Sequence, residues 1–152
     1  MAQQRRASIN DLARIIDLLV EDELGIKRET SRLVIDERYI TAFNKINQDP
    51  NQYLMVVENG DKIIATCHLT VMPSLTFTGS TRVQVEAVRV AQDLRGNKIG
   101  EWMMNEAILY AKSVGASIIQ LTTNKLRAKA KNFYTKLGFE ASHEGMKLYL
   151  NE

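Results

Sequence analysis

Residues 92–100 of the 152-residue chain read Gln92-Asp93-Leu94-Arg95-Gly96-Asn97-Lys98-Ile99-Gly100, and they are its most informative segment. Before it, Thr81–Val90 is rich in β-branched residues, as a strand is. After it, an apolar stripe of helical period runs as far as Gly115. The stretch therefore joins a strand to a helix. Backbone N–H groups of the loop and of the first helical turn lack partners there and point at one spot.

A junction of this kind binds anions, because the free N–H groups and the helix dipole both favour negative charge. Arg95 and Lys98 add positive charge to the loop. Gly96 and Gly100 have no Cβ and therefore let a ligand approach the backbone. The residues alone also allow the alternative of an ordinary strand-to-helix turn.

The strand before the loop changes phase near its end. Its apolar residues are Val83, Val85 and Ala87 and then Val88 and Val90. Successive side chains of a strand point to opposite faces. A slip of one residue therefore predicts a β-bulge at Ala87-Val88.

The remaining segments predict a mixed α/β fold with the order βααβββαβαββ. We expect helices at about 9–22, 36–47, 99–114 and 125–137, and strands at 3–7, 53–58, 62–72, 81–90, 117–123, 139–143 and 146–150. Asn59-Gly60-Asp61 predicts a hairpin between the second and third strands. The expected architecture is a single domain over residues 1–152, with a central twisted mixed sheet of about six to seven strands flanked by about four helices.

Composition excludes several classes of protein. The hydrophobic fraction is 45% and the charged fraction 25%, as in globular domains. The single Cys67 forms no internal disulfide and no CxxC zinc site, which predicts a reducing, cytoplasmic location. His68 and His143 have no local cluster of further ligands, so we expect no metal. The net charge of +2 is spread along the chain, and no apolar run spans a bilayer. Neither a nucleic acid nor a membrane is therefore an expected partner.

Two segments resemble the GNAT superfamily of acetyl-CoA-dependent N-acetyltransferases. They are Val88-Arg89-Val90 with the loop 92–100, and the segment Asn132-Phe133-Tyr134-Thr135-Lys136-Leu137-Gly138-Phe139. The element order is also similar to that of the GNAT fold. The resemblance implies that the loop holds the pyrophosphate of CoA through backbone amides. It also implies that the bulged strand diverges from its neighbour to admit the pantetheine.

The resemblance implies one set of cofactor-binding residues: Val88, Arg89, Val90, Arg95, Gly96, Asn97, Lys98, Ile99, Gly100 and Asn124. The family's middle glycine position is occupied by Lys98 in this chain. Asn124 resembles an asparagine that hydrogen-bonds the pantetheine. It could also cap the following helix, and the two roles are compatible.

Two further residues match catalytic positions of the family. Glu86 resembles a base that helps to remove the proton of the substrate amine. The alternative is a solvated strand residue in line with Arg82 and Gln84. Tyr134 resembles a tyrosine that donates a proton to the departing CoA thiolate, and its alternative is a tyrosine beside the core with its hydroxyl in water. The Val88 N–H resembles a donor to the acetyl carbonyl.

The resemblance implies an enzyme that moves the acetyl group of acetyl-CoA directly to a primary amine. Gln120–Arg127 is also similar to aminoalkylphosphonate acetyltransferases, which favours a small amine. Two alternatives stay open: a protein N-terminal or lysine acetyltransferase, and a non-catalytic CoA-binding sensor or interaction module. The sequence also leaves open whether the chain is a homodimer. Of His68 and Cys67, strand alternation allows only one to face an acceptor pocket.

Overall fold

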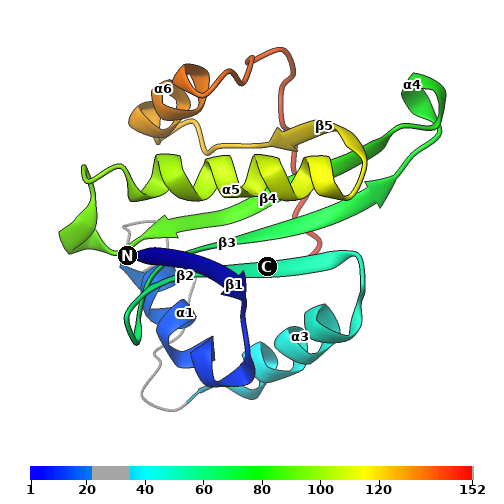
Figure 1. Cartoon of the computed structure of the whole chain (residues 1–152). Helices are drawn as coiled ribbons and strands as arrows, with labels where there is room; N and C mark the ends of the chain where they lie inside the picture. Colours follow the sequence, from blue (N-terminus) through cyan, green and yellow to red (C-terminus); the bar gives the residue numbers. More distant parts are fainter. Residues whose placement is uncertain (22–34, 152) are drawn as a thin grey trace.

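The computed structural model describes residues 1–21 and 35–151 (Figure 1). Its strands are β1 (Ala2–Arg6), β2 (Gln52–Asn59), β3 (Lys62–Pro73), β4 (Thr81–Val90) and β5 (Ala116–Leu121). Its α-helices are α1 (Leu12–Val20), α3 (Glu37–Gln48), α4 (Thr76–Gly79), α5 (Ile99–Ser113) and α6 (Ala128–Lys136). Two short 3-10 helices, η1 (Ile9–Asp11) and η2 (Gln92–Leu94), precede α1 and follow β4.

The strands form one mixed sheet in the order β1-β2-β3-β4-β5. The first four strands are antiparallel to their neighbours, and β5 runs parallel to β4. Parallel neighbours need a crossover, and α5 supplies it along one face of the sheet (Figure 1). The hairpin turn between β2 and β3 contains Gly60 at a φ of 66°, which glycine adopts without steric cost.

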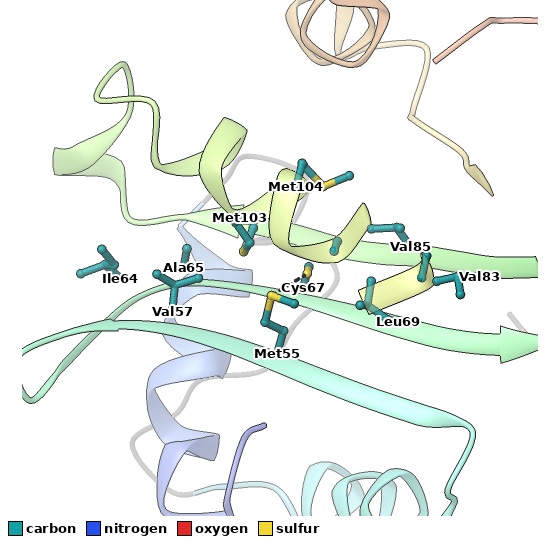
Figure 2. Close-up of a cluster of buried hydrophobic side chains, with 12 residues drawn as sticks. Met55, Val57, Ile64, Ala65, Cys67, Leu69, Val83, Val85, Met103 and Met104 are labelled. Carbon is teal, nitrogen blue, oxygen red and sulfur yellow. Dashed lines mark hydrogen bonds between the residues drawn. The ribbon is translucent and has the colours of Figure 1, made fainter. Parts of the chain in front are cut away.

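Helices cover both faces of the sheet. On one face, Met103 and Met104 of α5 pack with Met55 and Cys67 (Figure 2). On the other face, Ile16 and Leu18 of α1 share a cluster with Phe43 of α3 and Val56 of β2. Neighbouring residues of β2 therefore belong to different cores, as strand alternation requires.

An ion-pair cluster holds the first strand to the first helix. The Arg5 guanidinium donates to both carboxylate oxygens of Asp11, at 2.8 and 3.0 Å, and to Glu58 at 3.1 Å. Asp11 also accepts from the backbone N–H of Ser8 at 2.7 Å, which completes a capping box. Together these bonds lower the pKa of the buried Asp11, and the Arg5 hydrogen bond is the largest cause.

The structure confirms the mixed α/β class and most of the expected elements. Strand β4 has the expected bounds, and β5 ends two residues early. The last helix begins at Ala128 rather than at residue 125, because the N–H of Arg127 donates to the Asn124 carbonyl in a turn before it. Residue 22, the expected end of the first helix, lies outside the described residues.

The two strands expected at 139–143 and 146–150 are wrong. The described part of this segment forms no ladder with any strand, and the sheet therefore has five strands rather than six or seven. Figure 1 draws the segment as the red trace beyond α6. Alternating apolar residues favour an extended backbone, but a strand also needs a neighbour to pair its N–H and C=O groups.

We predict that Asp11→Asn lowers the free energy of unfolding by about 1–3 kcal/mol at pH 7, because it breaks a buried charge-assisted pair. The pKa of Asp11 is lowered on folding. Its contribution is therefore present above the unfolded value of 3.8 and is lost as the pH falls through the folded value. Urea denaturation between pH 3 and pH 7 measures this, with the exposed Asp61→Asn as control. A deficit that stays constant down to pH 3 would contradict the assignment.

Candidate functional site

The parallel pairing of β4 with β5 stops halfway along β4. The last register pair is Val85 with Leu121, while β4 continues to Val90. Residues 86–90 therefore have no strand neighbour on the β5 side in the described structure. Their backbone can pair with an extended ligand there.

The bulge predicted from the phase slip is present where β4 loses this neighbour. Glu86 lies opposite His68, and Arg89 lies opposite Thr66. Two residues of β4, Ala87 and Val88, thus oppose one residue of β3, and Ala87 has a φ of 53°. An extra residue in a bulge is left out of the ladder. A bulge also changes the direction of the local backbone, so an N–H group here can turn toward a ligand carbonyl.

The loop after β4 presents backbone amides at the start of α5. The first helical hydrogen bond runs from the Trp102 N–H to the Lys98 carbonyl, at 3.0 Å. The three amides before Trp102, from Ile99 to Glu101, thus precede the helical ladder. Gly96 has a φ of 89° and Lys98 a φ of 63°. These two left-handed residues turn the chain into the fifteen-residue α5.

Gly100 has a packing role that the sequence did not indicate. A Cβ built on it would lie 3.4 Å from Cζ of Phe133 and 3.6 Å from Cγ2 of Val90. The first turn of α5 therefore packs closely against α6 and the end of β4. A valine here would displace Phe133, so loss of ligand binding in such a variant would not by itself identify a ligand contact.

Tyr134 of α6 lies against the core beside the bulge. Its ring packs edge-on against Phe133 and Phe139, with centroids 5.0 and 5.8 Å apart. Burial raises the pKa of Tyr134 to about 12, and Cys67 acts in the same direction. The positive charges of Arg89 and Arg127 act in the opposite direction. The phenol is therefore fully protonated at neutral pH, with cations nearby.

Glu86 lines an open pocket of about 330 Å³ on the β2–β3–β4 surface. The pocket is bounded by Lys45, Ile46, Asp49, Gln52, His68, Thr70 and Glu86. Glu86 is exposed, whereas its neighbours on the same face of β4 make hydrogen bonds to β5. Arg82 donates to Gln120, and Gln120 donates to Gln84, at 3.2 and 2.8 Å. Glu86 thus takes no part in these side-chain hydrogen bonds and instead lines the pocket.

His68 faces this pocket, and Cys67 faces the α5 core, which resolves the alternative left by strand alternation. The Nε2 atom of His68 lies 2.6 Å from Oε1 of Gln52, which also accepts from Thr70 at 2.9 Å. Gln52 in turn donates to Asp49 at 3.3 Å. With Gln52 so oriented, the imidazole carries its proton on Nε2. Burial lowers the pKa of His68, although Glu86 opposes this shift, so the ring is neutral at pH 7.

Asn124 forms a turn and does not cap α6 directly. Its Oδ1 accepts from the N–H of Leu126 at 2.9 Å, and the N-cap position of α6 is Arg127. The expectation that Asn124 caps the helix is therefore wrong, because the helix begins three residues later than expected. Asn124 still follows β5, close to where β4 and β5 separate.

Sequence reasoning missed the α3 and β2 side of the pocket. Lys45 and Asp49 come from the end of α3, and Gln52 begins β2 opposite Thr70. Counting outward from the Asn59-Gly60-Asp61 turn would have paired Gln52 with Leu69, because the register between β2 and β3 shifts by one residue between Val57 and Glu58. No signal in the sequence brings the end of α3 beside them.

Residues 1–21 and 35–151 give little support for a metal site, a membrane-spanning helix or a cysteine nucleophile. This part of the chain has no group of three or more His, Cys, Asp or Glu residues arranged to hold a metal ion. None of its helices has both the length and the apolarity needed to cross a bilayer. Burial raises the pKa of the Cys67 thiol to about 12, so it is no nucleophile at neutral pH.

Comparison with known sequences gives one family. The model of the Acetyltransferase (GNAT) family matches residues 12–139. A curated relative, the aminoalkylphosphonate N-acetyltransferase of Salmonella typhimurium, is 29% identical over 98 residues, or 62% of this chain. The match spans 61% of the length of that enzyme.

Solved structures share the fold along the whole chain. A protein described as a transcriptional regulator from Bacillus halodurans is 40% identical, covers 99% of this chain and 100% of its own, and has a TM-score of 0.96. A score this high over nearly every residue requires the segment after α6 to follow the same course in both chains. A predicted acetyltransferase with acetyl-CoA from Clostridium acetobutylicum is 22% identical, with a TM-score of 0.75 over 99% of this chain and 97% of its own, and shares the fold.

We predict that Lys98→Gly raises the free energy of unfolding by about 1 kcal/mol. A side chain with a Cβ is strained at a φ of 63°, and glycine is not. The matched variant Lys98→Ala removes the same charge but keeps the strain, so it should unfold like the wild type. Urea denaturation of the three proteins measures the difference. Equal stabilities for the Gly and Ala variants would show that the backbone is not strained at this position.

Proposed function

Because the chain belongs to the acetyltransferase (GNAT) family, we propose that it transfers the acetyl group of acetyl-CoA to a primary amine of a small molecule. The observation that carries the proposal is the half of β4, residues 86–90, that β5 does not pair. One end of it leads into the amide-rich loop before α5, and the other end carries Glu86 at the open pocket. A single strand therefore connects an anion site with an acceptor site.

The features around the loop fit CoA. The amides of the first turn of α5, with Arg95 and Lys98 nearby, suit the pyrophosphate. The edge of β4 from Val88 to Val90, which β5 does not pair, suits the amides of an extended pantetheine, which can hydrogen-bond as a strand does. The ligand would compete there with the Arg89 and Arg95 side chains, which donate to the Val88 and Val90 carbonyls at 2.9 and 3.4 Å. The N–H groups at the bulge suit the thioester carbonyl, where negative charge develops during transfer. Asn124, where the strands separate, is a further ligand for the pantetheine.

The pocket beside Glu86 fits a small charged acceptor. Its volume of about 330 Å³ is that of a site for a small molecule. Glu86 and Asp49 attract an ammonium group, while Lys45 can neutralise an anionic group on the same substrate. The Salmonella relative is named for aminoalkylphosphonates, which carry both groups. We therefore favour a small amine with an anionic substituent over a protein N-terminus or lysine.

Glu86 would act on the amine before attack. An alkylammonium ion has a pKa of about 10, so little of it is nucleophilic at pH 7. A carboxylate at the pocket attracts the ammonium and accepts its proton, directly or through a water. The free amine nitrogen then attacks the thioester carbonyl carbon, and the carbon–sulfur bond breaks as the amide forms. The proton that the nitrogen loses in this step balances the one that the departing CoA thiolate gains.

Tyr134 would act on the departing sulfur. Its pKa of about 12 keeps the proton on the phenol until the thiolate develops. A thiolate is a weaker base than this phenolate, so complete transfer is uphill, and the hydrogen bond to the developing charge is the main contribution. Arg89 and Arg127, which lower the pKa of the phenol, reduce the cost of any transfer.

The relative from Bacillus halodurans favours a second candidate, because it is described as a transcriptional regulator. Under this alternative the chain would bind CoA without turnover and act on a partner. The net charge of +2 does not by itself favour a nucleic-acid partner, and Glu86 and Tyr134 have no function in a sensor. Turnover therefore separates the two candidates.

The deciding experiment combines binding and turnover. Calorimetry should show that acetyl-CoA binds much more tightly than pantetheine, which lacks the pyrophosphate. Mass spectrometry should then detect acetylated product and free CoA from a panel of aminoalkylphosphonates, amino acids, amino-sugar phosphates, polyamines and peptides. Binding without turnover of any amine would favour the sensor. Equal binding of pantetheine would overturn the role of the loop.

We predict that Tyr134→Phe lowers kcat about 100-fold and leaves the affinity for acetyl-CoA nearly unchanged. The phenylalanine ring keeps the edge-on contacts with Phe133 and Phe139, so the fold should survive. Steady-state kinetics and calorimetry measure the two quantities. An unchanged kcat would mean that the thiolate leaves without help from this phenol.

We predict that Glu86→Gln slows transfer most near neutral pH and recovers part of the rate near pH 10, where the substrate amine is already neutral. The expected loss at pH 7 is about 10- to 100-fold. The pH profile of kcat/KM measures this. Glu37→Gln, at an exposed position of α3 outside the pocket, is the control. A loss of equal size at every pH would assign Glu86 to substrate binding instead.

A further inference from the structure

The pocket beside Glu86 contains a series of hydrogen bonds that begins at the Asp49 carboxylate. Asp49 is held by its own turn, because its Oδ1 accepts from the N–H of Asn51 at 2.9 Å. Its Oδ2 lies 3.3 Å from Nε2 of Gln52. An ionised carboxylate only accepts hydrogen bonds, so the Gln52 atom that faces it must be the amide nitrogen. The side-chain oxygen of Gln52 therefore faces away from Asp49.

The backbone of Gln52 is held on both sides. Its N–H donates to the Asp49 carbonyl at 3.0 Å, and its carbonyl accepts from the Arg6 guanidinium at 2.8 Å. Gln52 begins β2, lies opposite Thr70 of β3, and is half-buried. The protein itself therefore fixes the orientation of this side chain before any ligand binds.

Gln52 determines the direction of the hydrogen bonds of His68 and Thr70. Its Oε1 lies 2.6 Å from Nε2 of His68 and accepts from the Thr70 hydroxyl at 2.9 Å. A carbonyl oxygen needs a donor from each partner, so His68 carries its proton on Nε2 and Thr70 directs its proton to Gln52. Burial lowers the pKa of His68, so its second nitrogen, Nδ1, has no proton at pH 7. In residues 1–21 and 35–151, no donor reaches Nδ1.

Glu86 adds a third acceptor to the same face of the sheet. It lies directly opposite His68 in the β3–β4 ladder, where facing residues have Cβ atoms about 4.5–5.5 Å apart. His68, Thr70 and Glu86 all line the same pocket. They offer an imidazole nitrogen without a proton, a hydroxyl oxygen whose proton is already donated, and a carboxylate. A primary ammonium group has three N–H donors, one for each of these acceptors.

We infer that Gln52 is a positioning residue that makes His68 and Thr70 hydrogen-bond acceptors. With Glu86 they form a subsite that selects a primary ammonium group. The inference rests on the proposed function only for the role of this ligand as the acetyl acceptor. An N-methylated ammonium has fewer donors and would leave an acceptor without a partner, which weakens binding. A metal ion fits less well, because the described ranges hold no group of three or more His, Cys, Asp or Glu residues arranged around one.

The first test measures the tautomer of His68 and needs no turnover. The chain has two histidines, so His143→Gln identifies the ring signals of His68 in a ¹⁵N NMR spectrum. At pH 8.5 the wild-type ring should carry its proton on Nε2. Gln52→Met removes the acceptor and should give a mixture of both tautomers, whereas Gln52→Glu keeps an acceptor oxygen and should keep the proton on Nε2. A wild-type proton on Nδ1, or the same tautomers in both variants, would overturn the role of Gln52.

The second test measures selectivity for the ammonium group. The probes are 2-aminoethylphosphonate and its N-methyl and N,N,N-trimethyl derivatives, each titrated into the wild-type protein with CoA present and followed by the His68 ring signals. The primary amine should bind about tenfold more tightly than the N-methyl derivative, and the trimethyl derivative should not bind measurably. Equal affinities for the three probes, or no binding of the primary amine, would overturn the subsite.

A matched pair of variants separates lost hydrogen bonds from steric exclusion. Thr70→Val should weaken binding of the primary amine about tenfold, and the primary and N-methyl amines should then bind about equally because one acceptor is gone. Thr81→Val, on β4 outside the pocket, should keep the wild-type affinities. A difference between the two amines that persists in Thr70→Val would assign the selectivity to the size of the pocket and contradict the inference.

Failure of this inference and failure of the proposed function are distinguishable. The tautomer and the binding of the probes are measured without acetyl transfer. A protein that passes both tests but acetylates no amine keeps the ammonium subsite and loses the proposed function. An enzyme that acetylates amines with the His68 proton on Nδ1 keeps the function and loses the inference.

Discussion

Strand β4 loses its parallel partner after Val85, opposite Leu121, and the candidate site is built on that interruption. If β4 were paired with β5 along its whole length, its N–H and C=O groups on that side would all bond to β5, and none could bind a ligand. Because the pairing stops halfway, the second half of β4 has no strand partner on that side, and the carbonyls of Val88 and Val90 accept from the side chains of Arg89 and Arg95 at 2.9 and 3.4 Å. The bulge at Ala87 and Val88 adds to this by removing one residue from the ladder with β3. The sheet thus remains continuous through β3 while it opens on one side.

The two proposed catalytic side chains lie in opposite environments because they come from different elements. Glu86 stands on an exposed face of β4, in contact with the open pocket and with water. Tyr134 comes from α6 and is held between aromatic rings and the core, where burial raises its pKa. A base should exchange its proton with solvent between turnovers, and an acid should keep its proton until it is needed. The fold places the solvent-exposed carboxylate and the buried phenol on the two sides of the same strand.

The sequence predicted those features of the fold that depend on neighbouring residues alone, such as the bulge and the hairpin turn. The phase slip gave the bulge because the two faces of a strand alternate strictly, and Asn59-Gly60-Asp61 gave the hairpin because its turn needs a positive φ. The two terminal strands were wrong because pairing depends on a neighbour that the pattern does not contain. The pocket residues Lys45 and Asp49 were missed because only the packing of α3 beside β2 brings them to Glu86. The roles of Glu86 and Tyr134 came from the family resemblance and stay predictions.

The burial of Cys67 protects the protein against thiol–disulfide exchange. It is the only cysteine in the chain, and it lies behind the bulge, fully shielded and with a raised pKa. A protonated, inaccessible thiol does not exchange with disulfides and is oxidised slowly. If the proposed acetyl transfer releases free CoA, an exposed thiol of the protein would form a mixed disulfide with that product under oxidative conditions. This chain should resist such inactivation, and a coloured thiol reagent should report the released CoA without interference from the native protein.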